Sequence, residues 1–200
     1  MQTFKKNKEY IFEIIHDIKA PIMSMDYALK TIPKNEILEE IYKINKHNLN
    51  YIENLLTTHL IEKGKYCPKF ELINLIQITE EELRVLNFLI TEKKLRINLS
   101  IDKINDGYIA SDKNLIKQII LNLLTNAIKY SPKNSLIKII FEKINNKIVI
   151  CFSNNYDNNI KPNSSKMGLN IIKSKLKVLK GKLKITKKDN EICYSVYLNC

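Results

Sequence analysis

A histidine and a carboxylate stand side by side at His16 and Asp17, and a proline follows at Pro21. An imidazole can act as a nucleophile or proton carrier near neutral pH, and a neighbouring carboxylate can orient its ring. Apolar residues recur around the pair at alternating steps of four and three, which predicts a helix packed in a bundle. His16 lies just off this apolar seam, towards solvent, so its position favours chemistry over core packing. The seam consists of Ile11, Ile15, Ile18, Ile22, Met25, Leu29 and Ile32.

The simplest alternative is that His16 is only a solvated side chain, as most lone surface histidines are. Pro21 argues against this interpretation. A proline inside a helix removes a backbone donor and kinks the helix at a cost of about 3 kcal/mol, so its presence needs a reason.

A second polar cluster lies in a helix that we predict from its cap at Asp112 to Tyr130. Asn122 and Asn126 are four residues apart and share one helical face, with Lys129 and Tyr130 one turn beyond. A carboxamide oxygen can complete the shell of a magnesium ion, and an ammonium group can meet phosphate charge. The alternative is an ordinary amphipathic helix whose asparagines face water.

Composition indicates a folded chain with a real core, since 44% of the 200 residues are hydrophobic. No apolar run approaches the roughly 20 residues that span a bilayer, and the polar start does not lead into a signal-peptide core. We therefore expect a cytoplasmic protein without a membrane span. Its cysteines lack CxxC spacing and we interpret them as reduced packing thiols, not zinc ligands. They are Cys67, Cys151, Cys193 and Cys200.

The formal charge of +12 raises the possibility of nucleic-acid binding, because clustered lysines neutralise phosphates. The lysines are scattered from Lys5 to Lys188 instead of clustered. This distribution favours a solvated basic surface, and no nucleic-acid partner is expected. A basic surface would also suit an acidic protein partner.

The periodicity predicts an α+β chain in two parts. Two helices, 4–32 and 36–62, form a hairpin around a turn capped at Asn35. Two helices cannot bury such apolar seams alone, so we expect a homodimer that forms a four-helix bundle. After a linker at 63–68, strands and helices alternate, which predicts an α/β sandwich. Its predicted strands are 70–73, 96–101, 108–109, 136–143, 147–153, 182–187 and 192–198, and its helices are 75–94, 112–130 and 168–180.

The His16 motif, the hairpin, the Asn122 to Tyr130 segment and the final Met167-Gly168-Leu169 segment match sensor histidine kinases in order and spacing. Across nearly its whole length the chain resembles this family. The resemblance implies a dimerisation and phosphotransfer hairpin at 1–65 and a Bergerat-type (GHKL) ATP-binding sandwich at 66–200. It also implies that His16 accepts phosphate, that Asp17 orients it or acts as a base, and that Asn122 binds Mg²⁺.

The same resemblance places the nucleotide-lining residues at Asn126, Lys129, Tyr130, Asn154, Gly168 and Leu169. The chain departs from the family at the strand-end Asp-x-Gly-x-Gly motif. Asn154 stands where the aspartate reads the adenine amino group, and Tyr156 stands at a glycine position, where its side chain would fill space. Lys166 replaces the first glycine of the second glycine box, and the loop before it is short for an ATP lid.

The function implied by the resemblance is that of a two-component phosphorelay protein. It would carry phosphate on His16, exchange it with an aspartate of a response-regulator receiver domain, and use ATP and Mg²⁺ as cofactors. Two alternatives stay open. One is a histidine phosphotransferase that works without ATP, and the other is a non-enzymatic, degenerate kinase that regulates a partner by binding to it.

Overall fold

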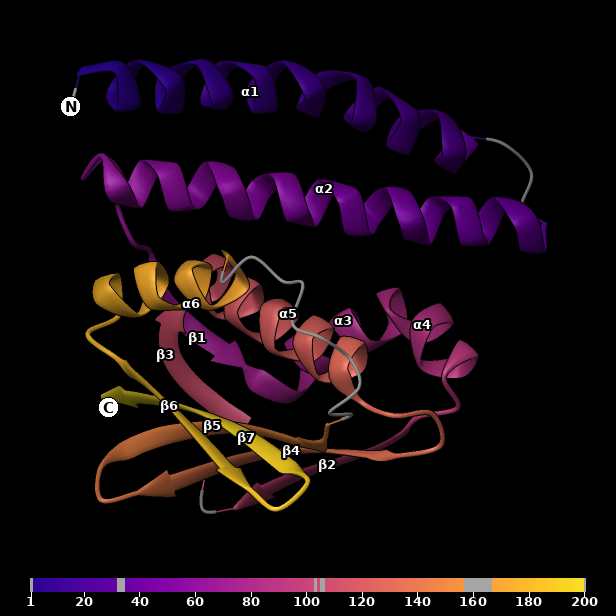
Figure 1. Cartoon of the computed structure of the whole chain (residues 1–200), viewed down its shortest axis with the longest axis vertical. Helices are drawn as coiled ribbons and strands as arrows, with labels where there is room; N and C mark the ends of the chain where they lie inside the picture. The colour runs from indigo at the N-terminus through magenta and orange to yellow at the C-terminus, as the bar shows by residue number, and fades with distance from the viewer. Residues whose placement is uncertain (1, 32–34, 103, 105–106, 157–166, 200) are drawn as a thin grey trace. The chain divides into compact units, whose positions relative to one another are not determined.

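The computed structural model describes residues 2–31, 35–102, 104, 107–156 and 167–199, and the chain divides into two compact units. The N-terminal unit is Met1–Tyr66 and the C-terminal unit is Cys67–Cys200. Figure 1 shows the helices and strands of both units. We find no helix among the described residues with the length and apolar character that crossing a membrane requires.

The N-terminal unit is a helical hairpin of α1 (Gln2–Thr31) and α2 (Glu36–Glu62), which pack along each other. Helix α1 continues across Pro21. Helix α2 begins where predicted, because the Asn35 side chain accepts a hydrogen bond from the Leu38 amide at 2.8 Å. The predicted turn at 33–34 and Ile32 of the seam lie outside the described residues.

The C-terminal unit is built on a five-stranded sheet in the order β2-β4-β5-β7-β6. Strand β2 (Arg96–Asp102) is parallel to β4 (Leu136–Ile144), and the other neighbouring strands are antiparallel. These other strands are β5 (Lys147–Asn155), β6 (Lys182–Lys188) and β7 (Glu191–Asn199). Strand β1 (Phe70–Asn74) pairs with β3 (Tyr108–Asp112) in a separate two-stranded sheet.

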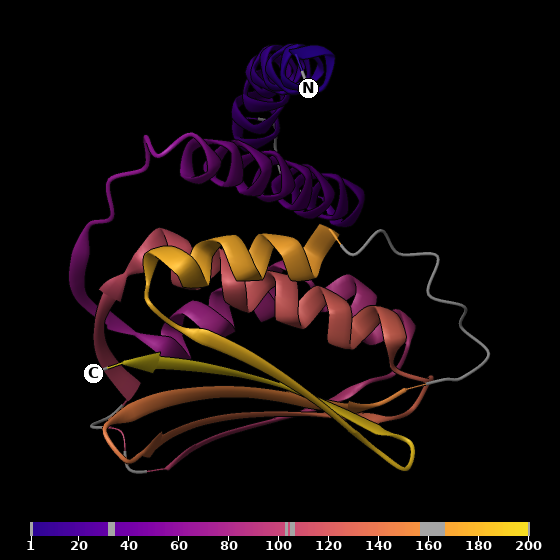
Figure 2. The same ribbon diagram turned by 60° about the vertical axis from the view of Figure 1, so that its left-hand side comes forward.

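The helices of this unit lie on one face of the five-stranded sheet, which gives a two-layer α/β sandwich (Figure 2). Helix α5 (Lys113–Tyr130) packs against β5, α6 (Met167–Val178) and α3 (Leu75–Val85). Phe141 and Phe152 alternate with more exposed residues along their strands and are fully buried on the helix side. The predicted fold class, a helical hairpin followed by an α/β sandwich, is confirmed.

One predicted helix proves to be two. The segment predicted as a helix over 75–94 forms α3 and the short α4 (Asn87–Glu92), separated at Leu86. Leu86 has backbone angles of φ −91° and ψ 3°, outside the helical range, and its side chain is only 2% exposed. The break lets both Leu86 and Ile90 reach the core, and no glycine or proline marks it in the sequence.

Two further segments extend beyond their predicted bounds. The extended pair predicted at 108–109 is part of the five-residue strand β3, because β1 supplies a partner for all five residues. Strand β5 continues to Asn155, so Asn154 belongs to the strand and not to the loop predicted to begin there. The hairpin turn at Asn145 and Asn146 is confirmed, since both residues have positive φ (46° and 61°).

Asp112 holds the start of α5, the helix that carries both asparagines. Its carboxylate is buried and accepts hydrogen bonds from the Leu115 amide at 2.9 Å and the Lys69 amide at 2.7 Å. We expect Asp112→Ala to lower the free energy of unfolding of the C-terminal unit by roughly 2–3 kcal/mol, because it removes the acceptor of two backbone N–H groups. Urea unfolding followed by circular dichroism measures the loss. Asp112→Asn keeps one acceptor and should lose less, and equal stability of all three proteins would contradict this role.

Candidate nucleotide site

The site begins with the face of α5 that carries Asn122 and Asn126, both half-buried. The Asn122 Nδ2 donates a hydrogen bond to the Gln118 carbonyl oxygen of its own helix at 2.7 Å. Of the two polar atoms of the amide, only the oxygen can coordinate a cation.

The first turn of α6 meets this face at Gly168. A Cβ atom at Gly168 would lie 3.6 Å from the Asn126 amide group and 3.7 Å from the Asn122 Oδ1. These are ordinary van der Waals distances, so the glycine is not required by sterics, but a side chain there would fill the space beside both amides. Three predicted site residues from two distant segments, 122–126 and 168, therefore come together between α5 and α6. Leu169, the next residue, is half-buried.

Asn154, near the end of β5, presents a buried acceptor without a partner. Its side chain is 2% exposed, and its Nδ2 donates to the Asn155 carbonyl oxygen at 2.6 Å. Its Oδ1 atom has no hydrogen-bond partner among the described residues. A buried, unpaired acceptor costs roughly 1–3 kcal/mol, and a ligand that carries a hydrogen-bond donor would remove this cost. The amino group of a purine base is a donor of this kind.

Lys129 and Tyr130 lie at the C-terminal end of α5, where the Lys129 Nζ is 5.4 Å from the centre of the Tyr130 ring. Lys129 is exposed and Tyr130 half-buried. Tyr130 also lies close to Tyr194 of β7. Burial raises the pKa of Tyr194, and its interaction with Tyr130 adds to the rise.

Lys93 holds the end of α5, a role that sequence reasoning missed. Its Nζ donates to the carbonyl oxygens of Ile128, Lys129 and Ser131 at 2.8, 2.8 and 3.1 Å. An ammonium group at a helix C-terminus satisfies carbonyl groups that the helix itself leaves unpaired. Lys93 thereby positions the backbone of Lys129 and Tyr130, although it lies more than thirty residues earlier in the sequence.

The tyrosine at the family's glycine position bonds to the turn between β6 and β7. The backbone N–H of Tyr156 donates to the Asn190 carbonyl oxygen at 2.9 Å, and its hydroxyl donates to the Asp189 carbonyl oxygen at 3.2 Å. The Lys187 Nζ lies 5.1 Å from the centre of its ring. Lys166, which replaces another family glycine, and the predicted short lid lie outside the described residues.

Helix α6 carries a fully buried lysine, Lys175, within an apolar stripe that includes Ile172 and Leu176. Burial removes its ammonium group from water and lowers its pKa from 10.5 to about 7. The unfolded chain therefore binds more protons than the folded chain between about pH 7 and 10.5, so stability should rise with pH in this window by up to about 1.4 kcal/mol per unit.

Unfolding at stepwise pH from 7 to 10 measures this rise. Lys175→Met should remove it, whereas Lys177→Met, at an exposed position on the same helix, should leave it unchanged. A slope that persists in Lys175→Met would show that another group causes it.

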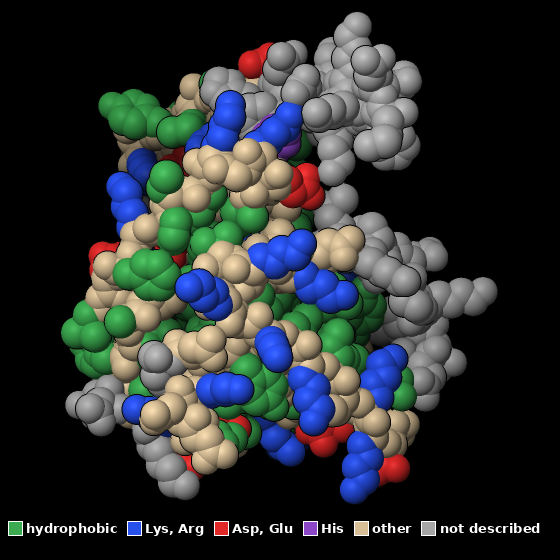
Figure 3. Space-filling view, turned by 90° about the vertical axis from the view of Figure 1, so that its left-hand side faces the viewer, with side chains coloured by type: hydrophobic (Ala, Val, Ile, Leu, Met, Phe, Trp, Pro, Cys, Tyr) green, Lys and Arg blue, Asp and Glu red, His purple; other side chains and the backbone are tan. Residues whose placement is uncertain are grey.

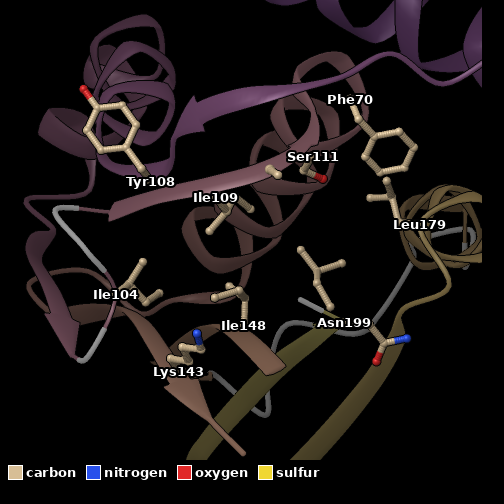
Figure 4. A pocket seen from close by; sticks show the side chains of 11 residues that line it. Phe70, Ile104, Tyr108, Ile109, Ser111, Lys143, Ile148, Leu179 and Asn199 are labelled. Carbon is tan, nitrogen blue, oxygen red and sulfur yellow. The ribbon is translucent and has the colours of Figure 1, made fainter. Parts of the chain in front are cut away.

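A separate cavity of about 280 Å³ lies at the other end of the C-terminal unit (Figure 4). Apolar side chains from β1, β3, β5 and the segment after α6 line it, together with Lys143 and Asn199. None of the predicted site residues is among its lining residues. Cavity size therefore does not locate the candidate site, which is defined by the two asparagines, Gly168 and the Asn154 acceptor.

The basic side chains do not form one cluster on the face of the molecule that Figure 3 shows. On the face shown in Figure 3, lysine and arginine side chains are separated by apolar and uncharged groups. This distribution agrees with the solvated basic surface expected from the sequence and offers no continuous track for a nucleic-acid backbone on that face.

The other two predicted site residues lie in the N-terminal unit. His16 and Asp17 are inside α1, and Asp17 is exposed. The side chain of His16 lies outside what the structure describes.

No protein-family model matches the chain. Among curated proteins it is similar to the sensor protein DltS of Streptococcus agalactiae, with 26% identity over 153 residues, which is 74% of this chain and 38% of DltS. It is also similar to the sensor protein KdpD of Clostridium acetobutylicum, with 29% identity over 141 residues, 65% of this chain and 15% of KdpD. The chain thus spans well under half the length of these relatives.

Solved structures share the fold. The histidine kinase AdeS of Acinetobacter baumannii aligns with a TM-score of 0.65 and 17% identity over 92% of this chain and 94% of that one. The histidine kinase ThkA, in complex with the response regulator TrrA, aligns with a TM-score of 0.54 and 19% identity over 97% of this chain and 61% of that one. The predicted resemblance is confirmed: the chain is related to sensor histidine kinases and has the fold of their catalytic core.

Proposed function

We propose that this chain is the phosphotransfer and catalytic part of a two-component histidine kinase. It accepts phosphate on His16 and exchanges it with an aspartate on a response-regulator receiver domain. The observation that supports this most is the meeting of Asn122, Asn126 and Gly168 beside α6, together with the unpartnered Asn154 acceptor. Sequence similarity to sensor kinases and the ThkA relative that binds a response regulator support the same conclusion.

The residues fit ATP and Mg²⁺. The Asn122 Oδ1, which lies near Gly168, would supply one oxygen ligand to a magnesium ion. The Asn154 Oδ1 would accept a hydrogen bond from the adenine amino group, and the exposed Lys129 ammonium would meet phosphate charge. ATP supplies the transferable phosphoryl group when it is bound.

The chemistry at His16 is nucleophilic. A neutral imidazole nitrogen would form a bond to phosphorus as the phosphorus–oxygen bond to the donor, ADP or the receiver carboxylate, breaks. Asp17 accepts a hydrogen bond from the other ring nitrogen and so keeps the reactive tautomer. The product is a phosphoramidate, which is labile enough to pass its phosphate to a receiver aspartate. This reaction takes place in the cytoplasm, where ATP and receiver domains are available.

The N-terminal hairpin, residues 1–65, is proposed to dimerise as a four-helix bundle, and residues 66–200 to bind the nucleotide. Helices α1 and α2 expose large apolar side chains that a single hairpin leaves in water, and a second copy would cover them. Each of these side chains is at least 40% exposed: Ile18, Met23, Met25, Tyr27, Ile37, Ile41, Ile44 and Tyr51.

Nucleotide binding is tested by titrating the purified chain with Mg-ATP in a calorimeter. We expect binding in the micromolar range, and we expect Asn122→Ala to weaken it at least tenfold because one magnesium ligand is lost. Thr125→Ala, on the same helix, is the matched control. Its hydroxyl bonds to backbone carbonyl oxygens of its own helix, those of Leu121 at 2.9 Å and Asn122 at 3.2 Å, and not to the Asn122 side chain.

Phosphate transfer is tested by incubating the chain with radiolabelled Mg-ATP, or with receiver domains that have been labelled on their aspartate. Label that is acid-labile and alkali-stable on this chain supports the proposal. Label from the receivers alone would identify an ATP-independent phosphotransferase. No label from either source, with the fold intact, would contradict the proposal and favour a non-enzymatic binding module.

A further inference from the structure

Two thiols outside the nucleotide site lie in direct contact. Cys151 of β5 and Cys193 of β7 are both half-buried, and their sulfur atoms are 2.7 Å apart. Both are free thiols, as the sequence predicted, but they are not simple packing residues. We propose that Cys151 and Cys193 form an oxidisable pair that closes a reversible disulfide between β5 and β7 when it meets a peroxide.

The sheet register explains why these side chains meet. Cys151 is paired with Ser195, and Ser153 is paired with Cys193, so the two cysteines occupy diagonal positions on neighbouring antiparallel strands. The right-handed twist of a sheet brings one of the two diagonals close enough for side chains to touch. The backbone pairing of β5 and β7 therefore places the two side chains within reach of each other.

The pair lies on the face of the sheet that the helices leave open. Phe152 and Tyr194, the neighbours of the two cysteines, point into the core, and side chains alternate along a strand. Cys151 and Cys193 consequently lie on the face of the sheet opposite to α5 and α6. A small oxidant can reach them without opening the core.

The neighbouring groups favour Cys193 as the reactive thiol. The hydrogen bond between the two thiols lowers the pKa of Cys193 to about 6, with help from the hydroxyls of Ser195 and Thr186, whereas partial burial and Glu191 act in the opposite direction. The Ser195 Oγ is 3.4 Å from the Cys193 sulfur. The pKa of Cys151 is raised, chiefly by the same bond, so Cys151 keeps its proton.

The reaction balances with one molecule of hydrogen peroxide. The Cys193 thiolate attacks a peroxide oxygen, so a sulfur–oxygen bond forms, the oxygen–oxygen bond breaks, and the leaving hydroxide takes up a proton to become water. The Cys151 sulfur then attacks the sulfenic sulfur of Cys193. The disulfide bond forms, the sulfur–oxygen bond breaks, and a second water leaves with the Cys151 proton.

The test treats the full chain with one equivalent of hydrogen peroxide and maps its peptides by mass spectrometry without reduction. We expect a product lighter by two hydrogens, a crosslinked peptide pair containing Cys151 and Cys193, and reversal by dithiothreitol. The exposed, isolated Cys67 serves as an internal control and should be oxidised at least tenfold more slowly.

Two serine variants separate the roles of the thiols. In Cys151→Ser, a dimedone probe should trap the sulfenic acid on Cys193, whereas Cys193→Ser should give little trapping at Cys151. The proposal would be overturned if Cys151 and Cys193 of the wild-type chain were still free thiols after peroxide treatment. It would also be overturned if the only crosslinks involved Cys67 or joined different molecules. Both outcomes are measured on the wild-type chain and do not depend on the folding of a variant. The test needs no nucleotide, so its outcome is independent of the kinase function.

Discussion

Replacing His16 by glutamine is expected to abolish the acid-labile phosphate that the wild-type chain acquires from Mg-ATP or from a phosphorylated receiver. Glutamine favours helix nearly as well as any residue, so α1 should persist, but its amide nitrogen cannot carry phosphate. Loss of an attacking nucleophile commonly costs several orders of magnitude in rate, so the label should fall by on the order of 10³-fold or more. Phosphoramidate-specific autoradiography measures this directly.

The other histidines and Asp17 provide the controls. His47 and His59 are the only further histidines in the sequence, and their glutamine variants should keep the label. Asp17→Asn should slow labelling by roughly 10²- to 10⁴-fold without abolishing it, because the carboxylate orients the ring and does not hold the phosphate. Full labelling of His16→Gln would transfer the role to another side chain and refute the proposed site.

Substitutions of Asn154 should lower or raise the affinity for Mg-ATP, depending on the new side chain. Asn154→Leu removes the buried Oδ1 acceptor that has no partner among the described residues, so Mg-ATP affinity should fall by about tenfold to a hundredfold. Asn154→Asp supplies the carboxylate that sensor kinases carry at this position, and its charge-assisted hydrogen bond should raise the affinity by about tenfold. Calorimetric titration measures both changes.

The unfolding free energy of Asn154→Leu shows whether a loss of affinity comes from the binding site or from a damaged fold. Because a buried acceptor without a donor destabilises the folded state, its replacement by an apolar side chain should leave the unfolding free energy of the ligand-free protein unchanged or higher. Wild-type affinity in a folded Asn154→Leu would show that the purine amino group bonds elsewhere. Loss of both affinity and stability would assign Asn154 a structural role.

The parts of the fold that the sequence predicted well are those set by local signals. Helix α5 begins and ends at its predicted residues because Asp112 caps its start and Pro132 follows its end. The β4–β5 turn follows from Asn145 and Asn146, since asparagine tolerates positive φ. The pairings of β1 with β3, β2 with β4 and β5 with β7 join strands that are not consecutive in the chain, so periodicity could not specify them.

In the candidate site, too, some features follow from local sequence and others depend on tertiary packing. The helical period alone places Asn122 and Asn126 on one face, whereas their meeting with Gly168 depends on the packing of α6 against α5. The bonds from Lys93 to the end of α5 also depend on tertiary packing, and a lysine in a polar segment carries no signal of such a role. The break at Leu86 is likewise imposed by burial and not by a helix-breaking residue.

The lysine-rich strand β6 opposes edge-to-edge association between copies of this chain. Strand β6 forms one edge of the five-stranded sheet, and sheet edges expose backbone groups that can pair with another molecule. Its four exposed lysines, at 182, 184, 187 and 188, would face like charges in any edge-to-edge pairing. Part of the net charge of +12 thus serves colloidal stability, and polyanions that neutralise it should promote aggregation through this edge.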